Sequence, residues 1–188
     1  MGTCDPRVHS SQPILGPALI VVIHTRPFIH SGRRAEASGA ALSYPPPNVH
    51  IMTNWINTVS RDHVRRGVRG RFAQANHGKP DTLRKMAHGD WIVFYSPKTA
   101  LEGGEPLRAF TAIGQIADDE PYEVEVTPDL RRWRRNVDFL SCTETPIRPL
   151  IADLQFIENK RAWGYRFRFG VFRIDDRDFD VIRSAMTG

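Results

Sequence analysis

The stretch "WIVFYS", residues 91–96, constrains the fold more than any other part of the chain. Its first five residues are apolar or aromatic, and no polar residue alternates with them. A strand with one face in solvent alternates apolar and polar side chains, whereas a strand covered on both faces is apolar throughout. The sequence therefore predicts a central strand here, in a sheet with other elements packed on both faces.

Strand-like and helix-like patterns flank this central segment. Ser60 is a suitable N-cap for a helix that ends between Gly67 and Gly70, with Val64 and Val68 one helical turn apart. Residues 175–186 predict a final amphipathic helix, and residues 149–160 are helical in part. Further strands are predicted for residues 53–60, 107–117, 122–126, 131–139 and 165–174. Together these elements indicate a small mixed α+β domain with a curled sheet or an open barrel.

Residues 1–51 have a different character from the rest of the chain. Prolines punctuate them, and their one apolar stretch, residues 14–23, is too short to cross a bilayer. We expect a disordered leader, or upstream sequence translated from a misassigned start codon. Met52 is then the expected start of a domain that covers residues 52–188.

Charge and cysteine content narrow the function only moderately. The formal net charge is +5, and Arg7, Arg26, Arg33 and Arg34 are the only basic residues before Met52. The rest of the excess lies in the predicted domain and is mostly arginine, which recognises phosphate well. The two cysteines make no metal-ligand spacing. No metal, cofactor or membrane contact is therefore expected, and the cytoplasm is the expected compartment.

Four blocks of sequence resemble one known family. They are "NWINTVSRDHVRRGVRGRFAQANHGK", "MAHGDWIVFYSPKT", "FTAIGQI" and the segment from "RPLIADLQFI" to "NKRAWGYRFRFGVFRI". Their order and content resemble the EVE domain family of the PUA-like superfamily, in particular its stand-alone bacterial members. The resemblance covers residues 53–186 and leaves out residues 1–51.

The resemblance implies a PUA-like pseudo-β-barrel with short flanking helices and no catalytic activity. Such a domain is expected to bind DNA or RNA and to take a flipped, modified base, methylated or hydroxymethylated, into an aromatic pocket. DNA is slightly favoured, because free-standing relatives resemble the reader modules of modification-dependent restriction systems. An effector protein of such a system is a possible partner.

Matching the family pattern onto this chain places the base pocket. We expect the base to stack between Phe72 and Trp163, beside Ser60 and Tyr95, because reading a flipped base needs ring faces and a few polar groups for its edge. The full set expected at the pocket is Asn57, Thr58, Val59, Ser60, His63, Phe72, Gln74, Tyr95, Ser96, Pro97 and Trp163. Core packing remains the alternative for Trp55 and Trp91, and helix capping for Ser60.

Two arginine clusters are the expected phosphate contacts. Arginines are dense in residues 61–71 and again in "RRWRRN" at residues 131–136, where they flank Trp133. A solvated charged face is the equally weighted alternative. The expected phosphate-binding residues are Arg61, Arg65, Arg66, Arg69, Arg71, Lys79, Arg131 and Arg132.

Three other functions are compatible with the sequence. One is RNA binding, which many PUA-like domains perform, and another is a module that takes a nucleotide or a peptide. The third is a small nucleotide-processing enzyme, but no nucleophile motif, phosphate-binding loop or metal-ligand pattern connects its candidate residues. These candidates are His63, His77, Asp62 and Asp90 as general bases and Cys142 as nucleophile.

Overall fold

The computed structural model describes residues 3–4, 51–75 and 79–188. All but three residues of the proposed leader therefore lie outside the described part, and so does His77. A two-residue strand, β1 (Thr3–Cys4), pairs with β8 (Cys142–Thr143).

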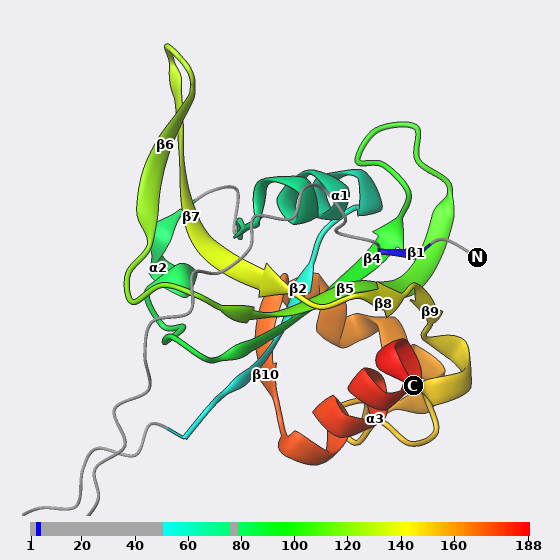
Figure 1. The fold of residues 1–188 in the computed structure, drawn as a ribbon. Helices are drawn as coiled ribbons and strands as arrows, with labels where there is room; N and C mark the ends of the chain where they lie inside the picture. The colour runs from blue at the N-terminus through cyan, green and yellow to red at the C-terminus, as the bar shows by residue number, and fades with distance from the viewer. Residues whose placement is uncertain (1–2, 5–50, 76–78) are drawn as a thin grey trace, which may run out of the picture. The chain divides into compact units, whose positions relative to one another are not determined.

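One curled sheet organises the domain (Figure 1). Its hydrogen-bonded order is β10-β2-β4-β5-β7-β3, with β6 added beside β7 and β9 beside β5. Among the described strands of this sheet, β2 and β4 pair in parallel and the other pairs are antiparallel. The strands are β2 (Asn54–Thr58), β3 (Phe72–Ala73), β4 (Trp91–Lys98), β5 (Pro106–Ile116), β6 (Tyr122–Thr127), β7 (Leu130–Phe139), β9 (Thr145–Pro146) and β10 (Val171–Ile174).

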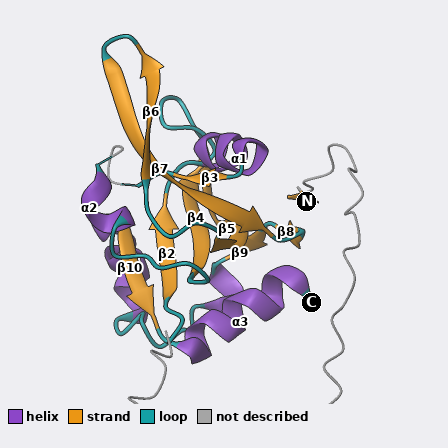
Figure 2. Ribbon diagram, turned by 60° about the vertical axis from the view of Figure 1, so that its left-hand side comes forward, coloured by secondary structure: helices purple, strands orange, loops and turns teal. Residues whose placement is uncertain are grey.

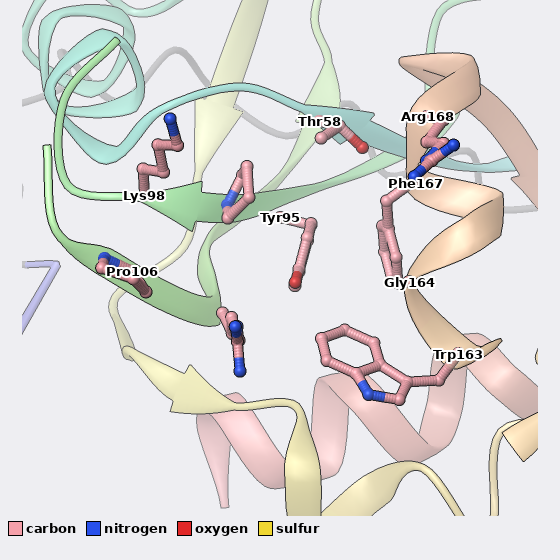
Figure 3. Close-up of a pocket in the computed structure, with 10 residues that line it drawn as sticks. Thr58, Tyr95, Lys98, Pro106, Trp163, Gly164, Phe167 and Arg168 are labelled. Atoms are coloured by element: carbon pink, nitrogen blue, oxygen red, sulfur yellow. The ribbon is translucent and has the colours of Figure 1, made fainter. Parts of the chain in front are cut away.

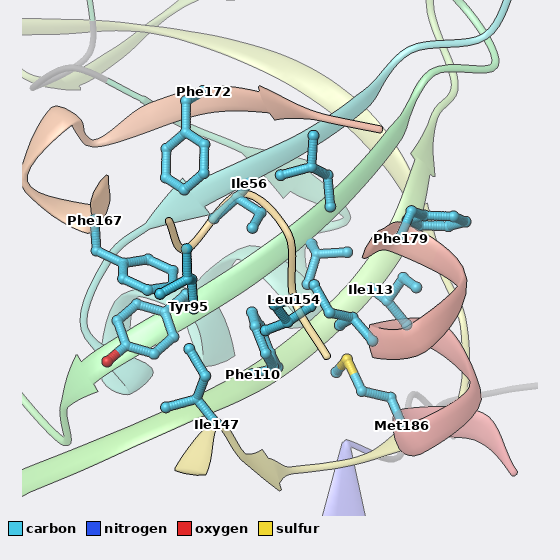
Figure 4. Packing of buried hydrophobic residues seen from close by; sticks show 14 of the residues in the cluster. Ile56, Tyr95, Phe110, Ile113, Ile147, Leu154, Phe167, Phe172, Phe179 and Met186 are labelled. Carbon is cyan, nitrogen blue, oxygen red and sulfur yellow. The ribbon is translucent and has the colours of Figure 1, made fainter. Parts of the chain in front are cut away.

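The prediction of a central strand at "WIVFYS" is confirmed. Strand β4 lies between β2 and β5, and its side chains pack into two different cores. Val93 and Tyr95 face one core, shown in Figure 4, whereas Ile92 and Phe94 face the other. All four are at most 3% exposed. Because both faces are buried, the strand needs no polar alternation.

Helices cover the two faces of the sheet (Figure 2). The C-terminal helix α3 (Asp176–Thr187) closes the core around Val93 through Phe179, Ile182 and Met186. Helix α1 (Arg61–Gly70) and the short α2 (Pro80–Leu83) cover the opposite core. The predicted α+β architecture, a curled mixed sheet with a few flanking helices, is confirmed.

The predicted strand over residues 165–174 is wrong in its first half. Residues Lys160–Phe169 form the 3₁₀-helical segment η3, which has a kink at Ala162, and the strand β10 begins only at Val171. Asn159 caps η3 by accepting hydrogen bonds from the amides of Arg161 and Ala162, and Gly170 ends it at φ 74°. The aromatic–arginine alternation that suggests a strand instead places aromatic side chains four residues apart on a helix. A shorter 3₁₀ helix, η2 (Arg148–Leu150), accounts for the partly helical segment before it.

Two further features of the sheet matter for its surface. Gly114 lies where β5 and β7 approach closely, because a Cβ there would sit 2.6 Å from the carbonyl oxygen of Asp138. A glycine is therefore required where these two strands meet. Strands β6 and β7 continue as a two-stranded hairpin that projects from the body of the domain (Figure 1).

Candidate functional site

A pocket of about 540 Å³ opens where the parallel strands β2 and β4 end. Thr58 and Tyr95, the last paired residues of these strands, form its floor together with residues of β5 and η3 (Figure 3). The pairing of β4 with β5 shifts register twice beside it, after Phe94 and again after Ser96. Such bulges redirect side chains and are over-represented near binding sites. The pocket is therefore built by irregular strand ends on one side and a helix on the other.

Aromatic side chains line this pocket. The ring of Phe167 stacks on Tyr95 at a centroid distance of 3.8 Å, and Trp163 meets Phe167 edge-on at 6.3 Å. Trp163 is only half-buried and lies against the open space, toward which the hydroxyl of Tyr95 points (Figure 3). Burial, partly opposed by the charge of Arg108, raises the pKa of Tyr95 to about 12. The phenol is thus protonated at neutral pH and can donate a hydrogen bond into the pocket.

Three cations surround the aromatic wall. Lys98, Arg108 and Arg168 line the pocket and are exposed, and none has an ion pair with an acidic residue in the described part of the chain. Arg108 adopts a left-handed backbone at φ 57°, which is uncommon outside glycine and is concentrated at functional sites. The rim is consequently positive, and no carboxylate among the described residues forms an ion pair with it.

Thr58 contributes an unsatisfied polar group. Its Oγ1 is buried and has no hydrogen-bond partner among the described residues. Buried hydroxyls nearly always find a partner, so this unpaired one beside the pocket is an exception among the described residues.

The structure brings together four of the eleven residues expected at the base pocket, namely Thr58, Tyr95, Pro97 and Trp163. Three others have structural roles. The side-chain amide of Asn57 donates to the carbonyl of Gln74 at 3.1 Å, and Ser96 is fully buried with its hydroxyl 2.8 Å from that of Thr111. These bonds hold the strands beneath the pocket and leave Asn57, Gln74 and Ser96 outside its lining.

Val59, Ser60 and His63 belong to the start of α1. The amide of Val59 bonds to the carbonyl of Tyr95 at 3.0 Å, which continues the strand pairing beyond β2. The hydroxyl of Ser60, the expected N-cap, donates to the Asp62 carboxylate and lies 3.1 Å from Nδ1 of His63. Burial by itself would raise the pKa of the Asp62 carboxyl, but the hydrogen bonds that it accepts from the Ser60 hydroxyl and the His63 amide make the pKa lower than its ordinary value. Ser60 occupies the N-cap position, but its side chain bonds to no helix amide; the Asp62 carboxylate accepts from the amide of His63 at 2.8 Å instead.

Phe72 does not line the pocket with Trp163. It lies in β3, paired with Asn136 of β7, and the guanidinium of Arg134 covers its ring at 3.7 Å. The expected slot between Phe72 and Trp163 is therefore absent from the described pocket, where Phe167 and Tyr95 supply the rings beside Trp163 instead.

Carboxylates neutralise most of the expected phosphate-binding arginines. Arg61 and Arg65 both reach Glu144, at 3.3 and 3.4 Å, and Arg66 reaches Asp62 at 3.5 Å. The remaining members differ. Arg71 forms an ion pair with Asp138, and Arg131 forms ion pairs with Glu123 and Glu125. In the described part of the chain, Arg132 bonds only to the backbone carbonyl of Arg131. Arg69 and Lys79 are exposed and have no ion pair with a described residue.

Sequence reasoning missed the residues that complete the pocket. Pro106, Phe167 and the rim cations Lys98, Arg108 and Arg168 were not expected there. The four-residue spacing of Trp163 and Phe167 was the available signal, but the strand pattern over the same residues obscured it.

Two of the residues weighed as catalytic candidates, Asp90 and Cys142, are buried in the described structure. Asp90 is buried and accepts from the amides of Thr53 and Ala87 and from the Trp55 indole at 2.8–3.0 Å. Cys142 is buried in the core and is not a free cysteine. Within residues 3–4, 51–75 and 79–188, no three His, Cys, Asp or Glu side chains gather as a metal site. No helix in that part of the chain has the length and apolar character needed to span a membrane.

Comparison with known proteins gives consistent matches. Residues 50–185 match the family model of the EVE domain. A UPF0310 protein of Mycolicibacterium vanbaalenii is 79% identical over 135 residues, which cover 72% of this chain and 93% of that protein. A UPF0310 protein of Mycobacterium avium is 76% identical over 136 residues, covering 72% and 99%. A solved hypothetical protein from Leishmania major, 14% identical, aligns over 71% of this chain and 94% of its own with a TM-score of 0.48.

Proposed function

The chain belongs to the EVE domain family, whose PUA-like domains generally bind nucleic acids, and on this premise we propose that it is a non-catalytic reader of a modified nucleobase. The base, methylated or hydroxymethylated, enters the pocket between β2, β4 and η3. The observation that supports this most is one concave site that combines three aromatic rings with an unneutralised cationic rim.

The rings supply the stacking energy. The indole of Trp163 offers a face to an incoming base, while the stacked pair of Tyr95 and Phe167 forms a rigid second wall. Base–aromatic stacking contributes about 1–3 kcal/mol per base and does not depend on sequence. Trp163 therefore provides affinity for any base that reaches the pocket.

Polar groups at the floor supply selectivity for the edge of the base. The protonated hydroxyl of Tyr95 donates, and the unpaired hydroxyl of Thr58 donates or accepts. A buried methyl group adds about 0.8 kcal/mol, which is about a fourfold difference in affinity. Discrimination beyond fourfold must then come from the shape of the pocket.

The rim cations complete the site. A flipped nucleotide carries its phosphates to the mouth of the pocket, where Lys98, Arg108 and Arg168 are free of carboxylate partners in the described structure. Most arginines of α1, in contrast, are paired with Glu144 or Asp62. We therefore assign the main phosphate contacts to the rim and a secondary, long-range role to α1. The effector protein of a restriction-type system remains a proposed partner.

The test compares oligonucleotides that carry methylcytosine, hydroxymethylcytosine, methyladenine or no mark, by fluorescence anisotropy at two salt concentrations. We expect one mark to bind more tightly than the unmarked strand, and Trp163→Ala to lower that affinity on the order of tenfold and to remove the preference.

Trp133→Ala is the matched control, since Trp133 lies on the β6–β7 hairpin, under Arg84, outside the pocket. Equal affinity for all four strands, or an equal loss of preference in both tryptophan variants, would overturn the proposal.

A further inference from the structure

Next to the pocket, helix η3 exposes two aromatic side chains that core packing does not explain. Tyr165 is 60% exposed and Phe169 is 55% exposed, and their rings meet in a T-shaped contact with centroids 5.5 Å apart. The other large exposed hydrophobic residues of the described chain are isolated in sequence or adjoin the leader. Paired aromatic rings left in solvent indicate an interaction surface.

The two rings adjoin the pocket because of their positions in the helix. Trp163 and Phe167 line the pocket, and so do Gly164 and Arg168, which directly precede Tyr165 and Phe169. Consecutive Cα atoms lie about 3.8 Å apart, so each exposed ring begins one residue away from the pocket wall. One helix thus carries an inner and an outer aromatic pair, each with a spacing of four residues.

The charge of this helix favours an anionic ligand. Residues 160–170 contain Lys160, Arg161, Arg166 and Arg168 and no acidic residue. The guanidinium of Arg166 lies over Phe172 at 5.2 Å and near Phe169 at 6.0 Å, which fixes a cation beside the outer pair. No ion pair joins Arg161, Arg166 or Arg168 to a carboxylate in the described part of the chain. Aromatic faces interleaved with unneutralised cations form the kind of surface that binds single-stranded nucleic acid.

We propose that Tyr165 and Phe169 form a stacking platform for the unpaired nucleotide next to the one in the pocket, with Arg161 and Arg166 on its phosphate, so that the ligand is single-stranded nucleic acid. This rests on the proposed base pocket. In a duplex, only the flipped base leaves the stack and its neighbours stay paired, so their faces are not available to the platform. In a single strand, the neighbouring base is free to leave its own stack and lie on the exposed rings.

The double variant Tyr165→Ala with Phe169→Ala tests the platform. Three DNA probes are used: a modified mononucleotide, a single-stranded dodecamer with the same modification at its centre, and the duplex of that dodecamer. We expect the wild-type protein to bind the single-stranded dodecamer more tightly than either the mononucleotide or the duplex. The double variant should lose on the order of tenfold in affinity for the single-stranded dodecamer and leave mononucleotide binding unchanged.

Two control variants separate the loss of base stacking from the loss of an exposed apolar side chain in general. Tyr165→Phe retains the ring and should bind like the wild type, and Val126→Ala removes an exposed apolar side chain from the hairpin, away from the pocket lining. Both target rings are exposed, so the double variant should unfold at the wild-type temperature.

The outcomes also separate this inference from the base-reader proposal. Unchanged dodecamer affinity in the double variant, or a wild-type preference for the duplex, would overturn the platform even if Trp163 still controls recognition of the mark. A platform-dependent preference for single strands without any preference for a mark would keep the platform and refute the reader.

Discussion

Tyr95→Phe tests whether the pocket floor is as dry as the structure implies. Tyr95 is 2% exposed, and burial raises its pKa from 10.0 to about 12. In the unfolded chain the phenol ionises near pH 10, whereas in the folded protein it resists ionisation until near pH 12. The folded pKa is the higher one, so the stabilisation is intact below pH 10 and is lost as pH rises from 10 towards 12.

The expected size follows from the shift. Each pH unit in that window costs about 1.4 kcal/mol of folding free energy, so the wild-type protein loses about 1.4 kcal/mol by pH 11 through this residue alone. Phenylalanine cannot ionise and escapes the loss. Other alkaline titrations, including that of Tyr122, whose pKa burial also raises, occur in both proteins and cancel in the difference.

The assay is urea unfolding of both proteins, followed by tryptophan fluorescence near pH 8 and near pH 11. We expect the stability of Tyr95→Phe relative to wild type to rise by about 1.4 kcal/mol between the two pH values. A difference that stays constant would show that water reaches the hydroxyl freely, and the dry pocket floor and its role in donating to a base edge would then be refuted.

Two further perturbations probe the frame and the electrostatics of the site. Asp178 is fully buried, and its carboxylate accepts from the amides of Gln155 and Phe156 at 2.7 Å each. Asp178→Ala should therefore lower the free energy of unfolding, measured by urea titration, by about 3 kcal/mol. Asp180 is exposed, so Asp180→Ala should change the free energy of unfolding by less than about 0.5 kcal/mol. Reversing charge at Arg65 and Arg66 should lower affinity for a single-stranded oligonucleotide and flatten its salt dependence; an unchanged salt slope would show that these side chains form only a solvated face.

Much of the fold was predictable because it depends on local patterns that burial enforces. The apolar run at β4 requires cover on both faces, and the acidic start of α3 places Asp175 as its cap, where it accepts from the amide of Asp178 at 2.8 Å. The failure at η3 has the same origin. Aromatic and arginine residues that alternate over residues 165–169 fit a half-buried strand, but they also fit a helix with Phe167 inside and Tyr165 and Phe169 outside.

The expected residues that do line the pocket lie at the ends of β2 and β4 and, in the case of Trp163, on η3. Thr58 and Tyr95 are adjacent because two parallel strands end together, which a strand pattern can indicate. Phe72 was a reasonable candidate as an aromatic residue among polar neighbours, but Arg134, 62 positions later in the chain, covers its ring. No local pattern reports that contact.

The amino-acid sequence alone therefore determined the class of the domain, its central strand, its family and its excess of arginine. Only the tertiary structure decided which rings share a pocket and which cations remain free to bind an anion. The physical reason is that side-chain pattern and backbone propensity act over a few residues, whereas a pocket and an ion pair depend on distances between distant segments. Glu144 neutralises Arg61 and Arg65 because folding brings it to α1, and Arg168 stays unpaired in the described structure because folding brings it no carboxylate.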